Sequence, residues 1–366
     1  MLKFVRQLSG VVGRGSKAIS KKFGYPRLTK DEVKLLSSLD MKYPNGPVCY
    51  FEFGKNDLRR TLYTFFKFFD LAGCNLIVEP NNALFAEMKG DIYGRWVIEE
   101  QLIKIGVKPE NPDGCFSLVN KKGMTLVSDN YFMFDEHDYY FPITQHPGMY
   151  QLGYWNKPVG LPADQRVQQI FFAGNFNINT YRRIKKDGLF DVIIRTDLLQ
   201  YLWENDEVYL INSSEQIGQQ QDLRKVIIAD TGNFEIPMKD LRQTLGKYNF
   251  FLAAPGASVP HSHNMAEALS VGCIPVIQDT YAHMIHPPLE HGKNALIFKD
   301  LNSLSKVIAE AGNLSKNQVT QMSHSVSDYY QLFMTPKAVI DRILDPAVNR
   351  VKVLSFSSSI NYLKRK

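Results

Sequence analysis

The sequence predicts an α/β protein of two domains, each built on a parallel sheet flanked by helices. A chain of 366 residues is longer than one hydrophobic core usually supports. In both halves, short apolar runs alternate with segments whose apolar residues recur at helical spacing. The hydrophobic fraction of 44% and the charged fraction of 22% are typical of an ordinary folded protein.

The first half contains a strand–helix–strand pattern. The run "VCYFEF" predicts a strand, a helix follows over 58–70, and "CNLIVE" predicts a second strand after a stop at Gly73. Two such strands joined through a helix are parallel, which gives a βαβ unit. A further helix is expected over 95–105, and several short strands over 115–145, with "KKG" as a turn.

The second half repeats this alternation more regularly. Strands are expected at "QQIFFAG", "VYLIN", "KVIIAD", "FFLAA", "CIPVI" and "ALIF". Helices are expected at "TYRRIKKDG", near 238–246, after Pro260, over 302–312 and over 325–345. This alternation predicts a doubly wound parallel sheet. A stretch rich in Gly and Pro, "YQLGYWNKPVGLPADQR", separates the halves. We therefore expect domains at 46–160 and 161–324, and a C-terminal helix that crosses back, followed by a basic tail, over 325–366.

The N-terminal segment 1–45 is expected to be a separate basic tail. It has no acidic residue before Asp31, and its basic residues outnumber the net charge of +6 on the whole chain: Lys3, Arg6, Arg14, Lys17, Lys21, Lys22 and Arg27. A segment over 1–24 that lies on an anionic membrane, an organelle transit peptide and a solvated tail all fit this composition. The remaining body is near neutral, which argues against a nucleic-acid-binding protein.

Two classes of protein are disfavoured by simple counts. No apolar run reaches the roughly 18 residues that cross a bilayer. The four cysteines are far apart and form no CxxC pair, so neither a zinc site nor a disulfide framework is expected. A cytoplasmic location fits best, either free in the cytoplasm or peripheral on the cytoplasmic face of a membrane.

The segment 250–279 carries the clearest sign of chemistry. A predicted strand stops at Pro255-Gly256, where small residues allow a ligand to approach the backbone. Ser258 is expected to cap the following helix, whose N-terminus would suit a phosphate. His263 and Glu267 are four residues apart and share a helix face, as do Asn264 and Ala268.

The expected ligand is a sugar nucleotide, with Glu267, as an exposed helix residue, accepting from ribose hydroxyls. His261, His263 or Asn264 would bind phosphate or sugar oxygens. The alternative is that Glu267 is an ordinary surface residue and that the histidines only cap the helix.

The residues "NFFLAAPG…HNMAEALSVGCIPVIQD" resemble the donor-site segment of GT-B glycosyltransferases, in particular the exostosin-like group. "FFAGNFNINTYRRI" resembles the first βα turn of the same domain, and "HPPLEHGKNALIF" its later sugar-side loop. The resemblance implies two Rossmann-like domains and places Gly174, Asn175 and Gly256 at the donor. Of the nearby basic residues, Arg195 and then Arg182 are expected to meet the diphosphate.

The resemblance also bears on mechanism. Many retaining GT-B enzymes carry two glutamates eight positions apart; Glu267 matches the second, but Val259 stands at the first. This favours an inverting transfer, which needs a base to accept the acceptor's proton. Glu52 and Asp57, after the first strand, are the first candidates, although Asp57 also suits an N-cap. Asp135, Glu136, His137 and His146 are others.

The resulting expectation is a glycosyltransferase that moves sugar from a nucleotide-sugar donor to a glycan or glycolipid acceptor. A nucleotide-sugar epimerase or hydrolase, and a non-catalytic glycan- or membrane-binding module, are the alternatives. No cofactor is expected and no metal, although His261-x-His263 could form half a metal site.

Overall fold

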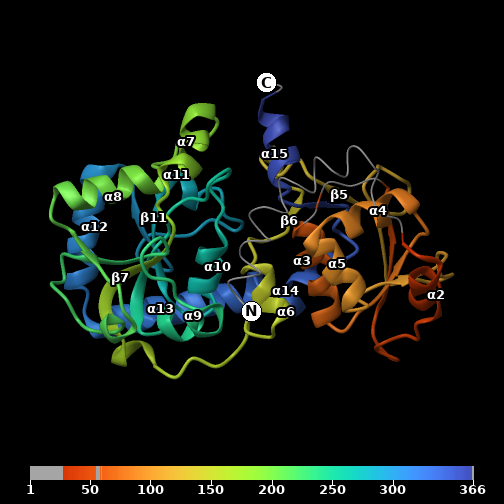
Figure 1. Ribbon diagram of the computed structural model, residues 1–366, viewed down its shortest axis with the longest axis horizontal. Helices are drawn as coiled ribbons and strands as arrows, with labels where there is room; N and C mark the ends of the chain where they lie inside the picture. Colours follow the sequence, from red (N-terminus) through yellow and green to blue (C-terminus); the bar gives the residue numbers. More distant parts are fainter. Residues whose placement is uncertain (1–27, 55–57, 59, 365–366) are drawn as a thin grey trace. The chain divides into compact units, whose positions relative to one another are not determined.

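The computed structural model describes residues 28–54, 58 and 60–364 and divides them into two compact units. The first unit holds the chain up to Tyr140 together with Ile340–Ser359, and the second holds Phe141–Val339 and the chain from Ile360 onward (Figure 1). The expected basic segment 1–24 lies outside the described residues, as does Asp57.

The first unit is built on a seven-stranded sheet in the order β3-β2-β1-β4-β5-β13-β6. All its neighbouring strands are parallel. The strand order reverses between β1 and β4, as it does in Rossmann-like sheets. The strands are β1 (Val48–Glu52), β2 (Asn75–Val78), β3 (Lys104–Ile105), β4 (Gly114–Ser117), β5 (Thr125–Ser128), β6 (Tyr139–Tyr140) and β13 (Arg350–Lys352).

Aromatic side chains form much of the first unit's core. Phe51 on β1 stacks on Phe116 of β4 at a centroid distance of 5.0 Å and meets Phe66 and Phe69 edge-on. Phe66 and Phe69 belong to α3 (Arg60–Leu71), whose phenylalanines recur at a spacing that buries one face of the helix. The helices of this unit are α2 (Lys30–Ser38), α3 (Arg60–Leu71), α4 (Asn82–Gly90) and α5 (Ile92–Glu99).

The second unit is built on a six-stranded parallel sheet in the order β12-β11-β10-β7-β9-β8. Its strands are β7 (Val167–Gly174), β8 (Val208–Leu210), β9 (Val226–Asp230), β10 (Tyr248–Leu252), β11 (Ile274–Gln278) and β12 (Leu296–Phe298). Strands β10 and β11 are buried throughout, as expected of central strands covered on both faces.

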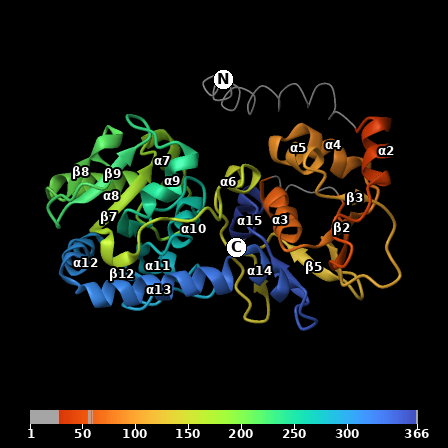
Figure 2. The same ribbon diagram turned by 90° about the horizontal axis from the view of Figure 1, so that it is seen from below.

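Helices flank the second sheet, and Figure 2 shows α12 and α13 together on one side of it. The helical segments from residue 147 onward are α6 (Pro147–Gln151), α7 (Ile178–Asp187), α8 (Arg195–Glu204), α9 (Met238–Leu245), α10 (His263–Leu269), α11 (Asp279–Ala282), α12 (Leu301–Asn313), α13 (Lys316–Phe333), α14 (Pro336–Ile343) and α15 (Phe356–Leu363). The predicted fold class, two Rossmann-like α/β units with parallel sheets, is confirmed.

Three local expectations differ from the structure. The helix predicted over 95–105 ends at Glu99, and Lys104–Ile105 form an edge strand instead. Residues 141–160, expected in the first domain, pack with the second unit. The predicted basic tail contains β13, which pairs with both β5 and β6. Its lysine, Lys352, is 1% exposed, so a basic residue near the end of the chain lies inside the first sheet.

Candidate functional site

The candidate site lies at the carboxyl edge of the second sheet. Strand β7 lies between β9 and β10. Strands β8 and β9 extend the sheet on one side of β7, and β10, β11 and β12 extend it on the other, so the strand order reverses at β7. Ligands of open α/β sheets bind beside such a reversal, at the carboxyl ends of the strands. Gly174 ends β7 at this edge, and the loop 253–262 follows β10 there.

The loop 253–262 is compact and needs glycine at one position. The Gly256 N–H donates to the Pro260 carbonyl at 2.9 Å. A Cβ atom on Gly256 would lie 2.7 Å from the Val259 oxygen and 2.8 Å from the His261 oxygen, both of which are backbone. No side chain fits there without displacing the loop. Gly256 is therefore required by the packing of the loop on itself, and the approach of a ligand to its backbone stays a prediction.

The helix after this loop begins later than the sequence predicts. Helix α10 starts at His263 with Ser262 as its N-cap residue, and Ser262 makes no side-chain cap bond. Ser258, predicted as the cap, is a half-buried loop residue instead. Pro260 and His261 extend the loop, because Gly256 closes it back on Pro260 before a helical turn can form.

Arg195 is the most unusual side chain at this edge. It is the first residue of α8 and is 5% exposed. Its Nε donates to the Pro255 carbonyl at 2.7 Å and its Nη2 to the Ser262 hydroxyl at 2.9 Å. The guanidinium also lies over the rings of Phe172 and Tyr181, at 5.0 and 5.1 Å from their centroids. These contacts fix its position against the loop.

Among the residues that the structure describes, no acidic side chain balances the Arg195 charge. Across the described part of the chain, no carboxylate lies within 4 Å of its guanidinium, and burial lowers the pKa of Arg195. Burying a cation without an anion costs free energy that hydrogen bonds to neutral oxygens offset only in part. The arrangement suits a bound anion, because an anion would supply the missing charge.

Two other predicted donor residues lie against Arg195. A Cβ atom on Gly174 would lie 2.9 Å from the Arg195 Nη1, so only glycine leaves room for the guanidinium there. Asn264 Nδ2 donates to the Ala173 carbonyl at 2.6 Å, which ties the start of α10 to the end of β7. Asn175 is half-buried, and its Oδ1 accepts from the Asn177 N–H at 2.6 Å.

Glu267 and His263 share a helix face as predicted, but the prediction that Glu267 is exposed is wrong. The Glu267 side chain is 1% exposed and that of His263 is 34% exposed. Glu267 Oε1 lies 3.0 Å from His263 Nδ1 and accepts from the His146 N–H at 3.0 Å. The His146 backbone thus contacts Glu267 across 121 residues of sequence, and nothing in the sequence near α10 indicates this contact.

The Glu267 carboxylate is ionised in this surrounding. Burial by itself would raise the pKa of Glu267, but the His263 ring, together with the backbone N–H and the ring of His146, outweighs it, so this pKa is lower than usual. Glu267 Oε2 is buried and has no hydrogen-bond partner among the described residues. The group of this pair that faces solvent is therefore the His263 ring.

His261 is a buried neutral side chain. It is 3% exposed, its Nε2 lies 3.1 Å from the Met284 carbonyl, and burial lowers the pKa of His261 to about 3. In this structure its ring is not presented to a ligand. The other predicted basic contact, Arg182, lies on α7, but its side chain is not among those described.

Glu52, the first predicted base, ends β1 at the reversal of the first sheet. Its side chain is 24% exposed and forms an ion pair with Lys121. No group of three His, Cys, Asp or Glu residues in the described ranges is arranged to hold a metal ion. Within those ranges, no helix is long and apolar enough to cross a membrane.

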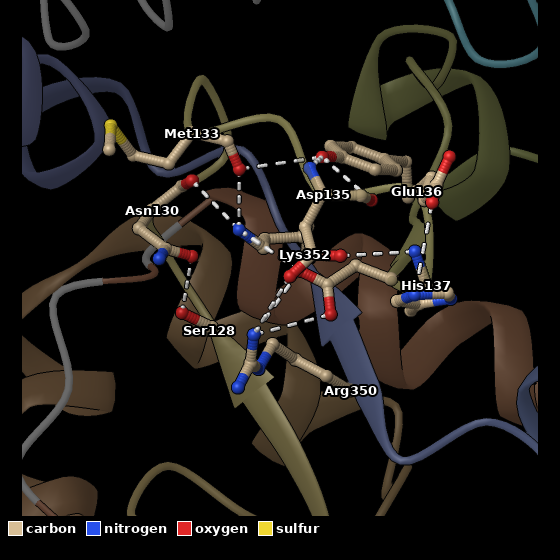
Figure 3. Close-up of polar contacts among 10 residues, drawn as sticks. Ser128, Asn130, Met133, Asp135, Glu136, His137, Arg350 and Lys352 are labelled. Carbon is tan, nitrogen blue, oxygen red and sulfur yellow. Dashed lines mark hydrogen bonds and ion pairs between the residues drawn. The ribbon is translucent and has the colours of Figure 1, made fainter.

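A second polar cluster lies in the first unit and includes Asp135, Glu136 and His137, which the sequence offered only as candidate bases (Figure 3). Lys352 Nζ at the end of β13 donates to the Met133 carbonyl at 2.7 Å and lies 3.1 Å from Asp138 Oδ2. Asp138, whose side chain is 4% exposed, also pairs with Arg350 at 3.3 Å. The cluster fastens the 129–138 loop to β13. Arg350 and Asp138 are 212 residues apart in the chain, so sequence spacing gives no sign of the cluster.

No protein-family model matches this chain, and a comparison with curated proteins finds no match. Solved structures similar to it include HepE of Anabaena in complex with UDP-glucose, with a TM-score of 0.37, 10% identity, and coverage of 81% of this chain and 98% of that one. WaaG, a glycosyltransferase involved in lipopolysaccharide biosynthesis, matches with a TM-score of 0.32 and 11% identity, and the match covers 81% of this chain and 99% of WaaG. T4 phage BGT in complex with UDP and Mn²⁺ matches with a TM-score of 0.35 and 11% identity, and the match covers 81% of this chain and 99% of BGT.

Proposed function

We propose that this chain is a glycosyltransferase of the GT-B type that takes its sugar from a nucleotide-sugar donor. The observation that carries the proposal is Arg195, a buried guanidinium without a carboxylate partner among the described residues, at the carboxyl edge of a doubly wound sheet. A diphosphate supplies the charge that this cation lacks, and charge-assisted hydrogen bonds to phosphate are among the stronger polar contacts in proteins.

The same residues can support the chemistry of transfer. When the bond between sugar and diphosphate breaks, negative charge grows on the leaving diphosphate. A fixed guanidinium beside that oxygen stabilises the charge without reorganising at the moment of reaction. Gly174 and Gly256 leave the backbone open beside it, because a larger side chain at either position would collide with Arg195 or the loop. We propose that no metal ion is required.

For the stereochemical outcome of transfer, we propose inversion of the anomeric configuration. Val259, eight residues before Glu267, is fully buried and carries no carboxylate. A single displacement then needs a base on the acceptor side, and Glu52 or Asp57 remains the proposal for it. We propose a glycan or glycolipid as acceptor, and we propose that the chain belongs to the exostosin-like group. For residues 1–24, contact with an anionic membrane surface at the cytoplasmic face remains a proposal.

The test is an incubation of the protein with UDP-, GDP-, ADP- and CMP-linked sugars, with and without a mixture of oligosaccharide and glycolipid acceptors, in excess chelator. Nucleotide release that depends on acceptor supports the proposal. Conversion of the sugar without acceptor indicates an epimerase or hydrolase instead. Absence of binding to every donor leaves a non-catalytic module, and loss of activity in chelator with recovery on Mn²⁺ contradicts the metal-independent mechanism.

A further inference from the structure

A pocket of about 450 Å³ lies at the amino edge of the second sheet, away from the candidate donor site. It is bounded by the segment that leads into β7, by the loop 220–223 before β9 and by the turn between α12 and α13. Arg166 stands immediately before β7, whereas Gly174 ends that strand at the donor edge, roughly 25 Å away. A volume of this size accommodates a small organic molecule, and none of the residues that line it belongs to the donor site.

Amide side chains at the start of β7 hold two walls of this pocket in place. Gln168 Nε2 donates to the Leu314 carbonyl at 2.7 Å, which ties the turn after α12 to the sheet. Its neighbour Gln169, which is buried, donates to the Asp222 carbonyl at 2.9 Å and so ties the loop before β9 to the same strand. The pocket is therefore formed before a ligand arrives, and binding does not have to order these segments.

Two cationic side chains line the pocket, and over the described ranges neither lies within 4 Å of a carboxylate. Arg166 Nε donates to the Leu161 carbonyl at 3.0 Å, whereas its Nη1 is buried with no hydrogen-bond partner in the described part of the chain. The other cation is Lys316, the exposed first residue of α13, and Asp164 is the only acid in the lining. A buried donor without a partner calls for a bound water or ion, and the excess positive charge favours an anion.

The rest of the lining suits the hydroxylated body of a small sugar. Gln165 and Gln220 contribute side-chain amides that bond to no other described residue. An amide both donates and accepts, as a sugar hydroxyl does, so the two groups match. Leu223 and Val319 add apolar surface against which the carbon face of a sugar ring can pack. An inorganic ion would leave these four side chains unused.

We infer that this pocket is a second binding site of the chain, and that its ligand is a hexose phosphate. The phosphate binds at Arg166 and Lys316, and the sugar hydroxyls bind at Gln165 and Gln220. Guanidinium and ammonium groups are the side chains that bind phosphate best, and the phosphate supplies the negative charge that the two cations lack. The inference does not rest on the proposed function, because it uses no donor-site residue and no chemical step.

The experiment is a calorimetric titration of the full chain with four esters: glucose 6-phosphate, fructose 6-phosphate, glucose 1-phosphate and N-acetylglucosamine 6-phosphate. Glucose and inorganic phosphate are titrated separately. At least one ester should bind with a dissociation constant of roughly 0.1–1 mM, and glucose and inorganic phosphate should bind roughly tenfold more weakly or less. Arg166→Gln should weaken the binding of that ester by roughly tenfold, and Lys316→Gln, at an exposed position that tolerates substitution, by roughly threefold.

A matched control separates the pocket from general effects of charge. Lys239→Gln removes an exposed cation of the same unit that does not line the pocket, and it should bind the ester like the parent. No binding of any ester to the parent, or equal binding to the parent and to Arg166→Gln and Lys316→Gln, overturns the inference. Inorganic phosphate that binds as tightly as the best ester would show an adventitious ion only. Displacement of the ester by excess UDP, GDP, ADP or CMP would place it at the donor site and also overturn the inference.

Discussion

At the scale of single residues, the sequence correctly predicted that Glu267 lies beside His263, but it wrongly predicted that Glu267 is exposed. The four-residue spacing to His263 was sufficient to predict that the two side chains meet. The burial of the carboxylate was not predictable, because it depends on the backbone of His146, which arrives from a distant loop. Of the two side chains, only that of His263 is partly exposed to solvent.

The burial changes what alanine at this position should do. Glu267→Ala leaves the His146 N–H without an acceptor and opens a small void, so the free energy of unfolding should fall by about 1–3 kcal/mol. Urea unfolding measures this. Glu204→Ala, at an exposed position of α8, is the control and should change stability by less than about 0.5 kcal/mol. Equal effects of the two substitutions would mean that Glu267 is a surface residue after all.

The burial of His261 should make the stability of the folded protein sensitive to acid. The pKa of His261 is lowered to about 3 by burial, so between that value and about 6.5 the unfolded chain binds a proton that the folded protein does not. The folded state therefore loses up to about 1.4 kcal/mol per pH unit as the pH falls through this window, and none above it.

The measurement is urea unfolding at pH 7 and pH 5. His261→Gln should lower stability at pH 7, yet it should lose less between pH 7 and pH 5 than the parent does. His286, whose pKa burial lowers to about 4, remains and leaves part of the dependence in place. His283→Gln, at an exposed ring, should follow the parent. An unchanged pH dependence in His261→Gln would contradict the buried neutral ring.

At the scale of elements, strands and long helices were predictable and the starts of short ones were not. The runs "IFFAG" and "CIPVI" lie in β7 and β11 as expected, because burial on both faces leaves an unbroken apolar pattern. The start of α10 was misplaced by several residues, because Ser258 has the residue type of a cap while the backbone loop through Gly256 decides where the turn begins.

The end of β7 predicts a steric effect on binding. Gly174→Ala places a Cβ atom 2.7 Å from the Phe172 ring and 2.9 Å from the Arg195 Nη1, so the guanidinium must shift. Nucleotide affinity, measured by calorimetry, should fall by roughly tenfold. Gly160→Ala, where the added atom meets nothing within 4 Å, is the control and should bind like the parent. Parent-like affinity in Gly174→Ala would place the ligand elsewhere.

At the scale of the whole chain, the composition fixed the number of units, but not which residues complete each one. Residues near 350 were predicted to belong to a C-terminal helix and a basic tail over 325–366. Lys352 is buried all the same, since Asp138 and a backbone carbonyl of the 129–138 loop satisfy its ammonium group (Figure 3). Such pairing between distant segments leaves no periodic trace in a sequence.

This pairing predicts that the C-terminal strand stabilises the first unit. Asp138→Asn leaves Lys352 buried without its counter-ion, so the free energy of unfolding of that unit should fall by about 3 kcal/mol. Adding Lys352→Met should restore part of the loss, because an apolar side chain tolerates burial. Asp164→Asn, at an exposed position, should have little effect. Additive losses in the double variant would show that the two side chains are not coupled.

The central claim is that Arg195 is kept buried for an anionic ligand rather than for the fold. Arg195→Met keeps an unbranched apolar stem and removes a charge without a carboxylate partner within the described ranges, and Arg224→Gln at an exposed position of the same unit is its control. Calorimetric binding of the preferred nucleoside diphosphate to Arg195→Met should weaken by roughly tenfold to a hundredfold, while its unfolding free energy changes by less than about 1 kcal/mol. Binding equal to that of the parent and of Arg224→Gln would contradict the account.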